Sequence, residues 1–176
     1  GMERSGCRGR IEKRGVDRSV WVWEPADYTK DYIVCADVSR GDSTDYSAFH
    51  VIELESCKQV AEYKGRVSTR DYGNMLVNVA QESNDALLVV ENNNIGWAAI
   101  QQIIERDYQN LFYASKDLKY VDTQRQVHNK HYREEKQMVP GFTMSMKTRP
   151  LVIAKLEEFF REKAVDVQSH RLIDEL

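Results

Sequence analysis

The sequence predicts an α/β domain with a five-stranded mixed sheet flanked by helices. Three short runs rich in β-branched and aromatic residues follow one another closely between residues 32 and 65, which indicates an antiparallel meander. After residue 65, helical and strand-like segments alternate, as they do where parallel strands are joined by crossover helices. Two of the runs, 33–36 and 86–90, are apolar without alternation, which is typical of strands covered on both faces.

The composition is that of a globular chain. The 176 residues are 41% hydrophobic and 30% charged, with a net charge of −3, so nothing global resembles a basic nucleic-acid-binding module. No apolar run is long enough for a transmembrane helix, and no secretory signal is present, so we expect no membrane association. The cysteines, Cys7, Cys35 and Cys57, have no metal-ligand spacing, and their odd number suggests a reducing compartment.

The first half of the chain divides into an arm and a meander. Residues 1–19 have no apolar period and are expected to form a flexible N-terminal arm, and residues 20–176 to form the domain. The segment 20–25 is interpreted as a lead-in strand or as part of an interface. Strands are expected at 32–38, 46–54 and 58–65, followed by a helix at 69–81 that Ser68 or Thr69 caps.

In the second half, a strand is expected at 86–91, a helix at 96–106 and a strand at 111–114. Trp97, Ile100 and Ile104 are predicted to share the apolar face of that helix, with Trp97 in the core. Residues 115–147 form a long polar segment, which inside a domain is usually functional or mobile. A last clear helix begins at Thr148, and a short strand at 164–167 and a helix start at 172–176 follow.

Acidic residues end the two all-apolar strands. Asp37 lies at the end of the first and Glu91 at the end of the second. If the two strands are parallel neighbours, both carboxylates meet at one sheet edge, where ligands of open α/β sheets bind. Two close carboxylates repel each other unless a cation intervenes, and hard oxygen ligands favour Mg²⁺ or Mn²⁺. The alternatives are a strand-end Asp37 that binds turn amides, and a Glu91 in a helix cap or surface salt bridge.

The order of elements is that of the ribonuclease H-like fold, and short motifs point to a narrower group. They are Ala36-Asp37-Val38-Ser39-Arg40-Gly41 with Asp45-Tyr46-Ser47-Ala48, Val89-Val90-Glu91-Asn92-Asn93, Gly141-Phe142-Thr143, Lys147-Thr148-Arg149-Pro150 and Asp174-Glu175-Leu176. In this order they resemble the nuclease domain of the large terminase subunit of tailed phages, over roughly residues 30–176.

The resemblance implies a metal-dependent endonuclease that cuts concatemeric double-stranded DNA during genome packaging. Asp37 would bridge two Mg²⁺ or Mn²⁺ ions and Glu91 would hold one of them. The family's third metal-binding Asp lies beyond the position of Leu176, so the domain is expected to be C-terminally incomplete in this sequence. The implied partners are the terminase ATPase domain, the portal and the small terminase subunit, in the cytoplasm of the infected bacterial host. No phosphate-binding loop of an ATPase is present in the sequence.

Several further residues are weaker candidates. Asp45 could bind metal or only shape a turn, and Asn93 could position a phosphate while Asn94 caps the next helix. Lys147 and Arg149 at a helix start could bind DNA or form a solvated face. His128 and His131 are interpreted as surface residues. Two other functions stay open: a non-catalytic DNA-guiding and docking module of a packaging motor, and another ribonuclease H-like nuclease such as a junction resolvase.

Overall fold

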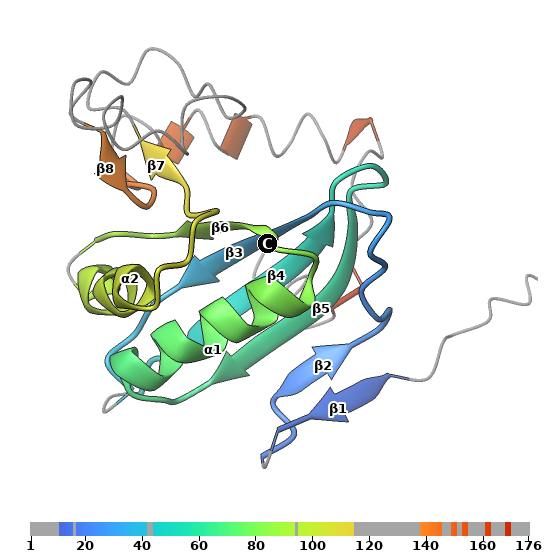
Figure 1. Ribbon diagram of the computed structural model, residues 1–176, viewed down its shortest axis with the longest axis horizontal. Coiled ribbons are helices and arrows are strands. Elements are labelled where there is room, and N and C mark those ends of the chain that lie inside the picture. Colours follow the sequence, from blue (N-terminus) through green and yellow to red (C-terminus); the bar gives the residue numbers. More distant parts are fainter. Residues whose placement is uncertain are drawn as a thin grey trace, which may run out of the picture.

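A computed structural model describes residues 11–15, 17–41, 44–93, 95–114, 138–145, 149–150, 153–154, 161–162 and 168–169. Its elements, in chain order, are β1 (Glu12–Arg14), β2 (Val20–Val22), β3 (Tyr32–Asp37), β4 (Ser47–Glu53), β5 (Lys58–Gly65), α1 (Thr69–Glu82), β6 (Leu87–Val90), α2 (Gly96–Glu105), β7 (Tyr113–Ala114) and β8 (Val139–Pro140). Six strands form one mixed sheet in the order β1-β2-β5-β4-β3-β6, and β7 and β8 form a small separate sheet (Figure 1).

The predicted meander and crossover are confirmed. Strand β3 pairs with β4, and β4 with β5, in antiparallel register. Helix α1 then crosses the sheet and returns the chain as β6, which is parallel to β3 with Ala36 opposite Val90. This connection places the carboxyl ends of β3 and β6 side by side, the arrangement that positions the candidate site.

The sheet differs from the prediction at both edges. Strand β2 pairs with β5, and β1 pairs with β2, so the predicted flexible arm contains a strand at Glu12–Arg14; residues 1–10 of that arm lie outside the described residues. At the other edge, Leu111 makes only a parallel bridge to Leu88, and the chain then leaves the sheet to pair as β7 with β8. Sequence patterning missed β1 because its three exposed polar residues carry no apolar alternation.

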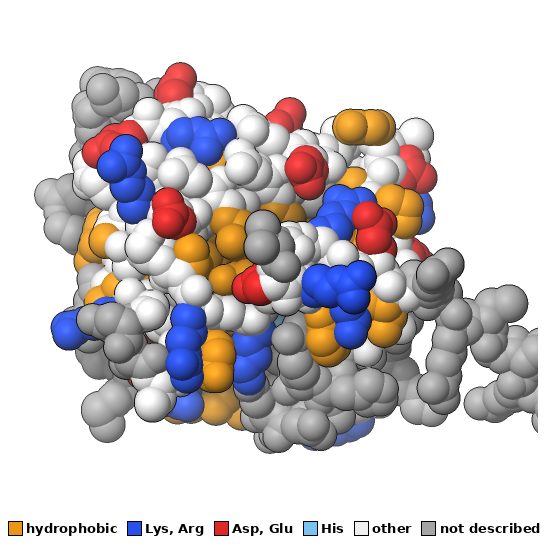
Figure 2. All heavy atoms as spheres, turned by 90° about the horizontal axis from the view of Figure 1, so that it is seen from below, with side chains coloured by type: hydrophobic (Ala, Val, Ile, Leu, Met, Phe, Trp, Pro, Cys, Tyr) orange, Lys and Arg blue, Asp and Glu red, His pale blue; other side chains and the backbone are white. Residues whose placement is uncertain are grey.

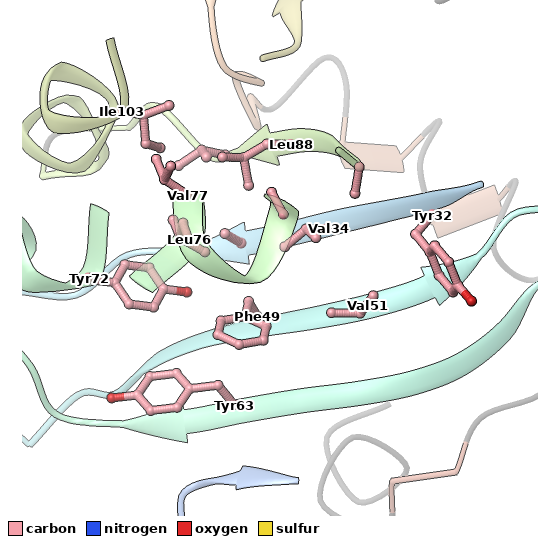
Figure 3. Packing of buried hydrophobic residues seen from close by; sticks show 14 of the residues in the cluster. Tyr32, Val34, Phe49, Val51, Tyr63, Tyr72, Leu76, Val77, Leu88 and Ile103 are labelled. Atoms are coloured by element: carbon pink, nitrogen blue, oxygen red, sulfur yellow. The ribbon is translucent and has the colours of Figure 1, made fainter. Parts of the chain in front are cut away.

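One face of the sheet carries the hydrophobic core beneath α1, with α2 packed beside α1 (Figure 1). Figure 3 shows Tyr72 and Leu76 of α1 lying over Phe49 and Tyr63 of the meander. The rings of Phe49 and Tyr63 stack with their centroids 5.5 Å apart. At the start of α1, the hydroxyl of Ser68 accepts a hydrogen bond from the Asp71 N–H, so Ser68 is the cap.

The prediction that Trp97 belongs to the core is wrong. Trp97 is 45% exposed, and the buried face of α2 consists of Gly96, Ala99, Ile100 and Ile103. The helices cross closely at Gly73, where a Cβ atom would lie 2.9 Å from the Ala99 carbonyl oxygen. This close approach turns the small residues of α2 toward α1 and leaves Trp97 on the outside.

A hollow of about 650 Å³ lies between α1 and the β2–β5 edge of the sheet, lined partly by Val22, Val60 and Met75. Figure 2 shows the molecule from below, with apolar side chains gathered at the centre of this face.

None of the helices in the described part of the chain has the length and apolar character needed to cross a bilayer. Residues 149–150, 153–154 and 161 are helical, within the helix predicted from Thr148. The remaining positions of that helix, and the elements predicted at 164–167 and 172–176, lie outside the described residues.

Candidate metal centre

Asp37 and Glu91 meet at one edge of the sheet. Asp37 is the last residue of β3, and Glu91 directly follows β6. The Glu91 N–H donates to the Ala36 carbonyl oxygen at 3.0 Å, which extends the parallel pairing to the position of the acid itself. The structure thus brings together the two carboxylates that the sequence placed at strand ends.

The two carboxylates interact directly. Partial burial raises the pKa of Glu91, and the adjacent Asp37 raises it further through a shared hydrogen bond and its negative charge. The amide of Asn93 and the positive charge of Arg149 act in the opposite direction on the same pKa. Holding both groups ionised is therefore unfavourable, and either a proton or a cation between them would relieve the repulsion.

Asn93 orients Glu91. Its Nδ2 donates to Glu91 Oε1 at 2.8 Å and to the Met144 carbonyl oxygen at 3.1 Å. The predicted role of Asn93 was contact with a phosphate, and the observed contacts are with the carboxylate and with the loop after β8. Such a neighbour fixes the direction in which a ligating carboxylate presents its oxygens.

The segment that follows β8 braces the Glu91 turn, and sequence reasoning missed the residue that anchors it. Asn92 is only 3% exposed; its Nδ2 donates to the Pro140 carbonyl oxygen at 3.0 Å, and its Oδ1 accepts from Thr143 Oγ1 at 2.8 Å. The Phe142 N–H donates to the Val90 carbonyl oxygen at 2.8 Å. The sequence signal for Asn92 was its place as a polar residue between a buried strand and a helix. Its hydrogen-bond partners, Pro140 and Thr143, lie 48 and 51 positions further along the chain.

Asp37 is supported from the core side. Tyr72 is fully buried, and its hydroxyl donates to the carbonyl oxygen of Ala48, the residue paired with Asp37 across β3 and β4. Burial and the nearby negative charge of Asp37 hold the pKa of Tyr72 well above its usual range, so Tyr72 stays a neutral donor. The backbone beneath Asp37 is therefore tied to α1.

Asp37 opens onto a cleft of about 610 Å³ on the sheet face opposite α1. Residues 39–40 and 44–46 line part of the cleft. The Ser39 N–H donates to Ser47 Oγ at 2.9 Å, and Ser39 Oγ donates to the Asp45 carbonyl oxygen at 3.2 Å. The cleft lining includes Asp37, Arg40, Asp45, Tyr46, Ala48, His50, Glu62 and Lys64. Its lining thus combines acidic and basic side chains.

The remaining candidates are placed less closely. In the described parts of the chain, no three His, Cys, Asp or Glu side chains lie close enough together to hold a metal ion, so a ligand role for Asp45 stays a prediction. Arg149 is exposed, and its charge acts on Glu91. Lys147 and Asn94, as well as His128 and His131 of the long polar segment, lie outside the described residues. The pair that remains, two oxygen-donor carboxylates in mutual repulsion, fits a hard divalent cation as part of its ligand set.

Comparisons with known proteins define the fold. No protein-family model matches the sequence, and no curated protein sequence matches it. The large terminase nuclease from thermophilic phage G20c with bound magnesium is similar at a TM-score of 0.65 and 15% identity, over 94% of this chain and 70% of that chain. The same nuclease with bound zinc is similar at a TM-score of 0.65 and 16% identity, over 95% of this chain and 79% of that chain. The same nuclease with bound cobalt is similar at a TM-score of 0.62 and 15% identity, over 90% of this chain and 67% of that chain. The chain therefore has the mixed α/β, ribonuclease H-like fold of these nucleases.

Proposed function

We propose that the chain is a divalent-metal-dependent endonuclease domain of a phage terminase large subunit, which cuts double-stranded DNA during genome packaging. The observation that carries the proposal is the convergence of Asp37 and Glu91 at adjoining carboxyl ends of parallel strands. The fold shared with terminase nucleases that bind magnesium, zinc or cobalt supports it. In this proposal, the partners are the packaging ATPase domain, the portal and the small terminase subunit.

The proposed cofactor is Mg²⁺ or Mn²⁺; Asp37 would contribute to holding two ions and Glu91 to holding one of them. When bound, such ions supply the charge that activates a water molecule and stabilises the leaving oxygen of a phosphodiester. Glu91 has to be deprotonated to bind metal, and its raised pKa makes ligation compete with a proton. Asn93 keeps one oxygen of Glu91 oriented, and Arg149 adds positive charge beside it.

Plasmid cleavage in the presence of Mg²⁺ or Mn²⁺ tests the proposal. We expect the wild-type chain to convert supercoiled plasmid to nicked and linear forms, and chelation of the metal to stop the reaction. Asp37→Asn and Glu91→Gln should each reduce the rate at least about a hundredfold, because each removes a carboxylate expected to hold the metal ions that stabilise the reacting phosphate. Asp31→Asn is the matched control, since Asp31 is exposed and precedes β3 at its opposite end.

The outcomes are distinct. Cleavage lost in both site variants and kept in Asp31→Asn supports a metal-dependent nuclease centred on this pair. Cleavage that survives Asp37→Asn contradicts the assignment of the site. DNA binding by the wild type without any cleavage contradicts an active nuclease formed by this sequence alone and favours a DNA-guiding module of the packaging motor.

A further inference from the structure

A row of side chains crosses the sheet from Asp37. Asp37 pairs with Ala48 on β4, and Ala48 pairs with Lys64 on β5, so the three side chains project from the same face. Two strand spacings separate Asp37 from Lys64, a distance of about 10 Å between their backbones. Ala48 between them has only a methyl group, and all three residues line the cleft.

A second row, one step further along the strands, holds an aromatic ring with two cations. Continuing the register of β4 and β5 places Tyr46 opposite Arg66 on the same face as Lys64. The guanidinium of Arg66 lies 4.7 Å from the centre of the Tyr46 ring, and Lys64 Nζ lies 5.5 Å from it. These are cation–π distances, and they hold two long side chains against the ring of Tyr46, which lines the cleft together with Lys64.

The charge of Arg66 is not neutralised by its contacts. Its Nη2 donates to the hydroxyl of Tyr46 at 3.3 Å and to the carbonyl oxygen of Thr44 at 3.4 Å, and both acceptors are uncharged. In the described part of the chain, no carboxylate lies within 4.0 Å of this guanidinium. Arg66 is exposed and Tyr46 is 46% exposed. A positive group is thus held in position and open to solvent, in a chain whose net charge is −3.

We propose that Lys64 and Arg66, positioned by the ring of Tyr46, bind the phosphate backbone of the DNA that lies across the Asp37 cleft. This inference rests on the proposed function and adds to it the direction in which the DNA runs: from Asp37 across β4 toward the end of β5. The separation of about 10 Å corresponds to about three nucleotide steps along a duplex. The contact is with backbone phosphates, so it carries no preference for base sequence.

Tyr46 acts in this arrangement as a positioning residue. Its ring and hydroxyl hold the Arg66 guanidinium, so that less side-chain entropy is lost when a phosphate binds. Its loss should weaken DNA binding without removing a charge. The salt dependence of binding distinguishes phosphate binding by Lys64 and Arg66 from positioning by Tyr46, because it reports the number of neutralised phosphates.

The test is binding of a short fluorescein-labelled duplex, measured by fluorescence anisotropy in EDTA at a series of salt concentrations. We expect Lys64→Gln and Arg66→Gln each to lower the affinity by about three- to tenfold and to reduce the slope of log K against log salt by about 0.9. Tyr46→Leu should lower the affinity while the slope stays that of the wild type. Duplexes of different base composition should give the same losses.

Lys13→Gln is the matched control. Lys13 Nζ lies 4.8 Å from the centre of the Trp21 ring, on β1 at the far edge of the sheet, so the variant loses the same charge from the same kind of contact. We expect it to bind DNA as the wild type does. Should Lys64→Gln unfold, as judged by circular dichroism, the exposed Arg66→Gln variant carries the test.

Each result bears on the inference separately from the nuclease activity. Equal salt slopes for the wild type, Lys64→Gln and Arg66→Gln overturn the inference. A loss of DNA affinity in Lys13→Gln as large as the losses in those two variants overturns it as well. A wild type that does not bind the duplex at low salt overturns it as well. Because EDTA removes the metal, none of these outcomes depends on cleavage, and plasmid cleavage by the wild type decides the proposed function independently.

Discussion

The replacement Gly141→Ala tests how the turn that carries Glu91 is held. Gly141 has φ of +87°, and a Cβ atom there would lie 2.6 Å from the Val90 carbonyl oxygen, 2.8 Å from Ile100 Cδ1 and 2.9 Å from Asn92 Cβ. Ordinary contacts begin at 3.4 Å, so the chain at Gly141 has to move away from the end of β6. That movement breaks the hydrogen bonds that hold the turn in place.

The cost has two parts. A non-glycine residue in the left-handed region costs about 1 kcal/mol. Crowding against a backbone oxygen and two packed side chains costs about 1–3 kcal/mol. The total is about 2–4 kcal/mol, which in a chain of this size lowers the melting temperature by about 5–15 °C. Nuclease activity should fall as well, because Glu91 is displaced from Asp37.

The control variant Gly15→Ala separates the backbone part of this free-energy cost from the crowding part. Gly15 has almost the same φ, +90°, but a Cβ atom there meets only Asp17 Oδ1 at 3.4 Å. We expect this control to lose about 1 kcal/mol at most and to retain activity. Thermal unfolding followed by circular dichroism gives the comparison. A Gly141→Ala protein that melts no lower than Gly15→Ala would mean that contacts around Gly141 do not hold the Glu91 turn.

Three further substitutions test Glu91 and two residues that support the site. Because burial and the negative charge of Asp37 raise the pKa of Glu91 in the folded state, stability falls as pH rises through that pKa; Glu91→Gln should therefore stabilise the metal-free protein at pH 7 by about 1 kcal/mol, the scale of a like-charge contact in water. The gain should vanish in acid, where Glu91 is protonated in both states, and a variant less stable than wild type in EDTA at pH 7 would contradict a destabilising ionised Glu91. Tyr72→Phe should cost about 1 kcal/mol in urea unfolding, because the Ala48 carbonyl oxygen loses its buried donor; an unchanged midpoint would argue against that bond. Asn92→Ala should cost about 2 kcal/mol and lower the nuclease rate, since two buried hydrogen bonds are lost; full activity would show that the brace is unnecessary.

The fold could be read from the sequence where one physical rule dominates. Apolar runs that end in Asp37 and Glu91 identify two buried strands, and a helix between them implies that they are parallel neighbours. The edge strand β1 was missed because its residues are polar and its pairing with β2 depends on a turn. Trp97 was misplaced because the face of α2 is chosen by a close crossing at Gly73, which periodicity does not reveal.

The supporting residues of the site depend on distant contacts. Asn92 is paired with residues 140 and 143, and no local pattern predicts such a pairing. The cluster of Tyr46, Lys64 and Arg66 follows from the exact register of β4 and β5, which shifts between Val51 and Ile52. A shift of one residue would turn these side chains to the other face, so their association with Asp37 needed the structure.

Calorimetry of Mn²⁺ binding to the wild type, Asp37→Asn and the control Asp31→Asn would show whether Asp37 and Glu91 form a metal centre. We expect saturable binding by the wild type and by Asp31→Asn that tightens as pH rises through the raised pKa of Glu91, and we expect Asp37→Asn to lose it. Equal binding by all three proteins, or none by the wild type, would contradict a metal centre at Asp37 and Glu91.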